Sequence, residues 1–242
     1  MIYSNKSMTK QLNKLSNEDF LFDVKQFIKS SHNFYGKKNP EIKTLASRLH
    51  QEYELRSFYN VFNKLWSSNY HNERSLAIHT LEIYKEDYDK DTWRFLIPKL
   101  KEIKDFDEAE RIGIIIGEMI IKYPALKREI LKISNRRNVY YRKIALSSCL
   151  PLIKTKDWDF VFMIIRNRIH DRESNITEFI VFLLIELSKK NKTLVKKFII
   201  SNRNVNNNIF NITARNFDDI NRIKKLNNYY NNSSIFEWLN NN

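Results

Sequence analysis

The stretch DFDEAERIGIIIGEMIIK, from Asp105 to Lys122, decides the fold of this 242-residue chain. It begins with acidic residues, which suit the exposed N–H groups and the positive end of the dipole at a helix N-terminus. It then becomes almost entirely apolar, and a helix with so few polar residues is buried on most of its sides. The stretch therefore predicts a central helix that is packed between neighbouring helices.

Two of the three glycines in the protein, Gly113 and Gly117, lie four residues apart in this helix. Glycine inside a helix costs up to about 1 kcal/mol relative to alanine. We therefore expect another helix to pack closely against both glycines. Phe106 and Glu110 are also four residues apart, so they share one face at the start of the helix.

The rest of the chain divides into pairs of predicted helices. First helices begin near Asn72, Asp107, Asn138 and Glu173, and second helices begin near Asp91, Pro124, Asp157 and Lys192. Both series advance by 31 to 35 residues, which is typical of an α-solenoid with two helices per repeat. The TPR and ankyrin signatures are missing, so the sequence predicts an all-α solenoid of HEAT-like repeats. An ordinary helical bundle is the alternative.

The repeats are predicted to form one domain, residues 18–228. It follows a polar, flexible N-terminus, residues 1–17, and precedes an Asn-rich, mobile tail, residues 229–242. Within the domain, EDFLFDVKQFIKS (Glu18 to Ser30) predicts an amphipathic helix, and residues 209–226 predict two short capping helices.

The chain is strongly basic, with a net charge of +14 and a pI of about 9.7. Such a surplus indicates a polyanionic partner, most simply nucleic acid. A genome biased towards Lys, Asn and Ile explains the charge equally well. The single cysteine, Cys149, excludes an internal disulfide, and neither a membrane span nor a signal-peptide core is visible. We therefore expect a cytoplasmic protein.

The motifs of several enzyme classes are missing. The five histidines show no metal-ligand spacing, and the sequence lacks a glycine-rich phosphate loop and a GxSxG elbow. What remains is a set of aromatic and charged residues at matching places in successive first helices: Phe106, Glu110, Tyr140, Tyr141, Arg142, Lys143 and Phe182. Equivalent positions of a solenoid line one surface, and this mixture suits a nucleic-acid backbone. The alternative is that the aromatic residues belong to the core, and periodicity alone favours that for Phe182.

Five stretches of the chain follow one another in an order and spacing that a known family shares. They are FYGKKNPEIKTLASRL, FNKLWSSNYHNERSLAIHTLEIY, KDFDEAERIG, NVYYRKIAL and FIVFLLIELSKKNKTLV. Over about residues 30–200 the chain thus resembles the bacterial DNA alkylation repair family, the AlkD-like alkylpurine DNA glycosylases built from HEAT-like repeats. The resemblance implies a concave DNA-binding face.

The resemblance also implies a role for individual residues. Glu110 falls on the catalytic aspartate of the family, and Phe106 falls on the tryptophan four residues before it. Lys143 falls on the family's arginine, with Arg142 as a one-residue alternative, and Phe182 falls on a second tryptophan of the cleft. Each difference keeps the chemical type and changes its size or geometry.

The implied function is that of a monofunctional glycosylase that hydrolyses the N-glycosidic bond of N3- or N7-alkylated purines. Glu110 would stabilise the positive charge that develops on the sugar. Such an enzyme needs no metal or nucleotide cofactor and acts on double-stranded DNA, here as a nucleoid-associated monomer. A second possibility is a catalytically inactive member that binds distorted or branched DNA, and a third is a protein-binding solenoid.

The position of the charged side chains distinguishes these functions. DNA binding predicts that the basic residues Lys43, Arg74, Arg142 and Lys143 converge on one face, with Tyr140 and Tyr141 beside them. Catalysis predicts an unpaired Glu110 on that face. An ion pair between Glu110 and either Arg111 or Lys143 would count against catalysis.

Overall fold

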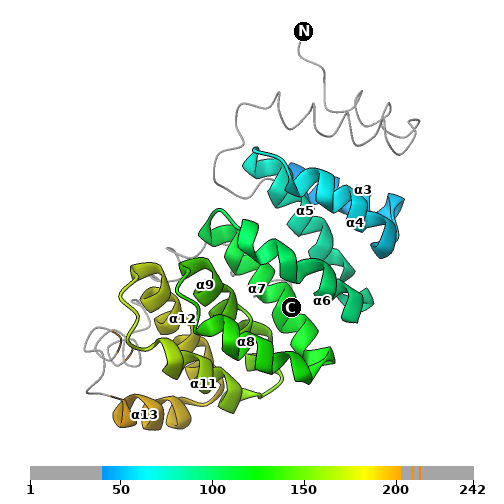
Figure 1. Ribbon diagram of the computed structural model, residues 1–242. Helices are drawn as coiled ribbons and strands as arrows, with labels where there is room; N and C mark the ends of the chain where they lie inside the picture. The colour runs from blue at the N-terminus through cyan, green and yellow to red at the C-terminus, as the bar shows by residue number, and fades with distance from the viewer. Residues whose placement is uncertain (1–39, 203–208, 210–212, 214–242) are drawn as a thin grey trace. The chain divides into compact units, whose positions relative to one another are not determined.

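The structure is a computed structural model that describes residues 40–202 together with Ile209 and Thr213 (Figure 1). All regular elements of these residues are helices, as the sequence predicts. No helix of this part of the chain is both long and apolar enough to cross a membrane. The predicted helix from Glu18 to Ser30 lies outside the described residues, as do the predicted capping helices apart from Ile209 and Thr213.

The chain divides into two compact units, and the first ends at Asp87. Its described helices are α3 (Pro40–Glu52), α4 (Leu55–Trp66) and α5 (His71–Ile83), followed by the short 3₁₀ helix η1 (Tyr84–Asp87). Helix α5 packs against both α3 and α4. The core contains aromatic side chains from α4, where the rings of Phe62 and Trp66 stack with centroids 5.5 Å apart.

The second unit begins at Tyr88 and contains the remaining helices. They are α6 (Lys90–Leu96), η2 (Ile97–Glu102), α7 (Phe106–Lys122), η3 (Pro124–Leu126), α8 (Lys127–Ser134), α9 (Val139–Ser147), α10 (Cys149–Lys154), α11 (Trp158–Arg168), α12 (Ser174–Lys190) and α13 (Lys192–Ser201). The helix starts follow the two predicted series and confirm the paired repeats. The helix predicted from Asn138 is divided into α9 and α10, because Pro151 has no N–H to donate to the carbonyl of Ser147.

Helix α7 is the central element of the second unit. Its N-cap, Asp105, accepts a hydrogen bond from the N–H of Glu108 at 2.9 Å, as the acidic start of the helix predicts. The helix packs against α9 and α10 at its two glycines. A Cβ atom on Gly113 would lie 2.5 Å from the Cβ of Ser147, and one on Gly117 would lie 2.5 Å from the carbonyl oxygen of Ser148. The predicted close approach is confirmed.

Replacing Gly113 by Ala tests this packing. Alanine is the better helix former by about 1 kcal/mol. However, its Cβ would also lie 2.7 Å from the backbone oxygen of Ile144, which cannot move independently of α9. We expect G113A to lower the free energy of unfolding by about 1–3 kcal/mol, measured by urea denaturation. M163A, at an exposed position of α11, is the control and should change it by less than about 0.5 kcal/mol. A G113A protein as stable as wild type would contradict the packing argument.

Candidate nucleic-acid interface

Glu110 and Lys143 form an ion pair between the two central first helices. Glu110 lies in the second turn of α7 and Lys143 at the middle of α9. The Nζ atom of Lys143 lies 2.8 Å from Oε2 of Glu110. The two residues are only 3% and 4% exposed, for Lys143 and Glu110 respectively. The sequence placed both in the candidate site, and the structure brings them together in the interior.

The surroundings of Lys143 are largely aromatic. Its Nζ lies 3.6 Å from the ring centroid of Phe179 on α12, which is the geometry of a cation–π interaction. The ring of Phe179 is tilted against that of Phe182, with centroids 5.7 Å apart, and Phe182 is itself buried. Burial lowers the pKa of Lys143, while the charge and the hydrogen bond of Glu110 oppose that shift. The candidate residues Glu110, Lys143 and Phe182 therefore meet in the protein core.

Three aromatic candidates lie closer to solvent. Phe106, in the first turn of α7, is half-buried and meets Tyr140 of α9 edge to face at 5.4 Å. The hydroxyl of Tyr140 donates to the carbonyl oxygen of Lys104 at 2.8 Å. Tyr141 is also half-buried. The N-terminal ends of α7 and α9 thus present aromatic side chains that a ligand can reach.

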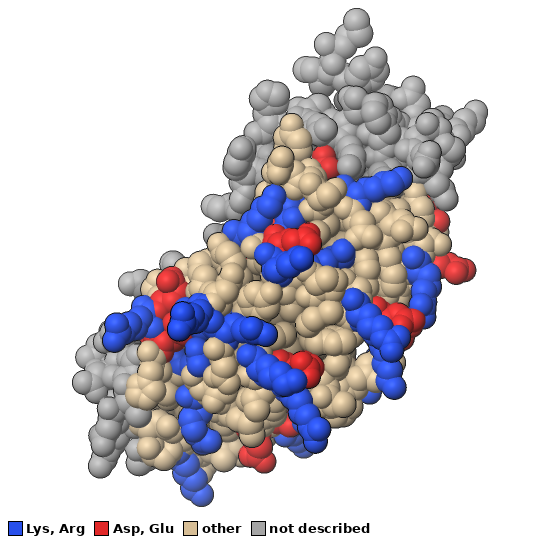
Figure 2. Space-filling view, in the orientation of Figure 1, with Lys and Arg blue, Asp and Glu red and all other residues tan. Residues whose placement is uncertain are grey.

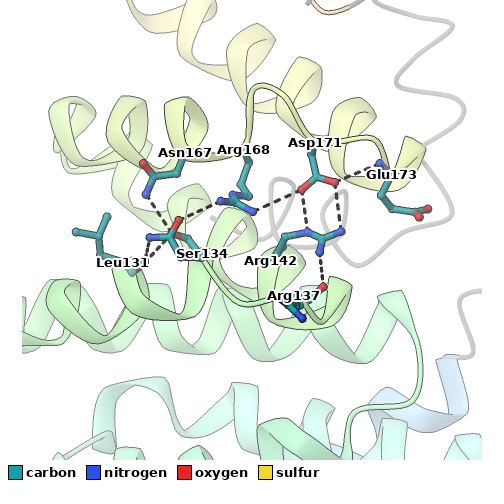
Figure 3. Close-up of polar contacts among 9 residues, drawn as sticks. Leu131, Ser134, Arg137, Arg142, Asn167, Arg168, Asp171 and Glu173 are labelled. Atoms are coloured by element: carbon teal, nitrogen blue, oxygen red, sulfur yellow. Dashed lines mark hydrogen bonds and ion pairs between the residues drawn. The ribbon is translucent and has the colours of Figure 1, made fainter.

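Arg142 is held in a polar network between two loops (Figure 3). Its Nε and Nη2 lie 2.8 and 3.2 Å from the carboxylate oxygens of Asp171, and Nη1 donates to the carbonyl oxygen of Arg137. Asp171 also accepts a hydrogen bond from the N–H of Glu173, the N-cap residue of α12. Arg142, which lies in α9, thus connects the loop that contains Arg137 to the loop that contains Asp171.

The two basic candidates of the first unit differ in accessibility. Lys43 on α3 is exposed. Arg74 on α5 is buried, and its Nη1 donates to the carbonyl oxygen of Trp66 at 2.6 Å. The guanidinium also lies 3.6 Å from the centroid of the Trp66 ring. Arg74 therefore connects α5 to the end of α4 within this unit.

Sequence reasoning missed three exposed cations, Lys104, Arg137 and Arg172. Each directly precedes the N-cap residue of a first helix, that is, of α7, α9 or α12. Successive members of this set are 33 and 35 residues apart, which is the spacing of the repeats. This spacing is the signal in the sequence that could have identified them. All three residues lie in loops, outside the predicted helices.

A cleft lies at the opposite end of α7. It is lined by Lys90, Trp93, Arg94, Lys122, Tyr123, Pro124, Ala125 and Leu126. Because α7 has 17 residues, it is about 25 Å long. The cleft is therefore separate from Phe106 and Glu110 at the start of the helix.

Comparison with known proteins identifies one family by sequence and a similar fold in two solved structures. A family model described as "DNA alkylation repair enzyme" matches residues 8–215. No curated protein matches the chain. The fold is similar to that of a predicted DNA alkylation repair enzyme from Enterococcus faecalis, with a TM-score of 0.61 and 16% identity over 77% of this chain and 89% of that one. It is also similar to AlkD2 from Streptococcus mutans, with a TM-score of 0.62 and 16% identity over 82% and 98% of the two chains.

Replacing Glu110 by Gln tests the buried ion pair. The substitution leaves the charge of Lys143 buried without its anion, so we expect E110Q to lose about 3–5 kcal/mol of unfolding free energy at neutral pH. It also removes the carboxylate that supports the pKa of Lys143, which then falls further below 10.5. At a pH between that lowered pKa and 10.5, Lys143 is neutral in the folded chain and protonated in the unfolded chain. The unfolded chain then binds more protons, so the free energy of unfolding of E110Q should rise with pH.

The measurement is urea unfolding between about pH 6 and pH 9.5, below the ordinary lysine pKa. E118Q removes a half-buried carboxylate from the same helix and serves as the control. Equal stability of E110Q and E118Q at neutral pH would contradict the role of the Glu110–Lys143 pair.

Proposed function

Because the chain belongs to the DNA alkylation repair enzyme family, we propose that its role in repair is to recognise alkylated duplex DNA through the basic surface of the second unit. The chain carries 42 Lys and Arg residues against 28 Asp and Glu residues. Figure 2 shows basic side chains across the visible face of the described residues, with acidic ones between them. Such a surface binds the phosphate backbone by releasing counterions.

The ion pair between Glu110 and Lys143 is the observation that favours recognition over catalysis. A carboxylate that stabilises charge on a deoxyribose must approach the sugar closely. Glu110 is 4% exposed and bonded to Lys143 at 2.8 Å, so in this arrangement it is engaged within the protein. Lys143 is equally engaged and cannot bind a phosphate without leaving Glu110 and the ring of Phe179.

Glycosylase activity is the second candidate function. The position of Glu110, one turn after the half-buried Phe106, supports it, because DNA that contacts the aromatic ring would come close to the carboxylate. In that mechanism Lys143 would leave Glu110 for a phosphate, and the ionised carboxylate would stabilise the sugar cation as an N3- or N7-alkylated purine departs. Misplacing such a group by about 1 Å can cost about 10²-fold in rate, so Glu in place of Asp predicts slow turnover.

One experiment separates the two functions. Purified protein is mixed with methylated duplex DNA, binding is measured by fluorescence anisotropy, and released 7-methylguanine and 3-methyladenine are quantified. We expect salt-dependent binding of the duplex and no base release above that of E110Q, whose folding is checked by circular dichroism.

Base release by wild type that is lost in E110Q would overturn the recognition proposal in favour of the glycosylase. Absence of any duplex binding would overturn both, since each function requires contact with the DNA backbone.

A further inference from the structure

For each of the three first helices of the second unit, the residue directly before the N-cap is an exposed cation. These cations are Lys104, Arg137 and Arg172, which come directly before the N-caps Asp105, Asn138 and Glu173. Their separations of 33 and 35 residues are those of the repeat itself. Equivalent positions in successive repeats lie next to one another, so the three cations follow one edge of the unit.

Hydrogen bonds to the backbone hold these loops in a row. Tyr140 of α9 donates to the carbonyl oxygen of Lys104, which connects the loop before α7 to the next first helix. Arg142 donates to the carbonyl oxygen of Arg137 and pairs with Asp171, which connects the loop before α9 to the loop before α12 (Figure 3). The exposed cations are therefore carried by loops of fixed relative position.

The ion pairs of the network do not involve Arg137 or Arg172. Asp171 is directed at Arg142 and, at 3.9 Å, at Arg168. Among the residues that the structure describes, no ion pair involves Arg137 or Arg172. The N-termini of α7, α9 and α12 lie at the same edge and add the positive ends of their dipoles.

The spacing of the edge fits a nucleic-acid strand. Packed helices lie about 8–10 Å apart, and the phosphates of one strand of B-DNA advance about 3.4 Å along the axis. Because the strand winds around the axis, its neighbouring phosphates are farther apart than this axial rise, so successive cations would meet neighbouring phosphates or every second one. We propose that Lys104, Arg137 and Arg172 form a ladder that binds the phosphates of one strand of duplex DNA, and that Arg142 and Asp171 are its positioning residues. This inference rests on the DNA-binding function proposed above.

The ladder is tested by the salt dependence of duplex binding. Removing one cation that binds a phosphate reduces the slope of log K against log[salt] by about 1. We expect that reduction in K104Q, R137Q and R172Q, measured separately by fluorescence anisotropy. The matched control is R128Q. Arg128 is also exposed, but it lies at the start of α8, which follows the C-terminal end of α7. Slopes of R137Q and R172Q equal to that of R128Q would overturn the ladder.

Replacing Asp171 by Asn tests the positioning role, because electrostatics and positioning predict opposite changes in DNA affinity. Asp171→Asn removes a negative charge, so electrostatics alone would tighten DNA binding. If Asp171 instead holds Arg142 and the loops, D171N should bind more weakly than wild type. D159N removes an exposed carboxylate from the start of α11 and controls for charge, and thermal melting monitors folding. Tighter binding by D171N, similar to that of D159N, would overturn the positioning role.

The wild-type protein separates the two proposals. If it shows no salt-dependent binding to duplex DNA, the proposed function is wrong and the ladder with it. If it binds while all three ladder variants keep the wild-type slope, the function stands and only the ladder is wrong.

Discussion

The close approach of α7 to α9 and α10 is the constraint on which the second unit depends. It exists because Gly113 and Gly117 have no Cβ, and any side chain there would overlap Ser147 or the backbone of Ser148. At this separation, a residue in the second turn of α7 can bond directly to one in α9 without an intervening water. The glycines thus determine both the packing of the core and the short distance between Glu110 and Lys143.

That distance changes what the candidate catalytic residues can do. Two buried charges must recover a large desolvation cost, and they do so only with good geometry and additional interactions. Lys143 meets both conditions: the carboxylate of Glu110 lies 2.8 Å from its Nζ, and the face of the Phe179 ring adds a cation–π interaction at 3.6 Å. A glutamate side chain is one methylene longer than an aspartate, which extends its reach across the helix interface. The same extra length that suits an internal ion pair would displace a catalytic carboxylate.

The sequence predicted the repeat architecture and much of the grouping of the site. Helix starts follow from periodicity and capping residues, and the tight packing at Gly113 and Gly117 follows from the cost of glycine in a helix. Burial of Glu110 and Lys143 could not be predicted, because it depends on how far α7 and α9 rotate towards each other. The same holds for Asp171, since nothing local in the sequence indicates that an aspartate in a loop will bond to an arginine 29 residues before it.

Charged residues occupy two separate places in this unit. Glu110 with Lys143, and Asp171 with Arg142, are engaged internally and connect neighbouring helices or loops. Lys104, Arg137 and Arg172 lie at the surface, one per repeat, where a polyanion can reach them. DNA binding through these cations, as proposed above, would therefore not require the ion pair in the core to open, whereas catalysis by Glu110 would. In such an arrangement, affinity for the phosphate backbone would not depend on whether Glu110 takes part in chemistry.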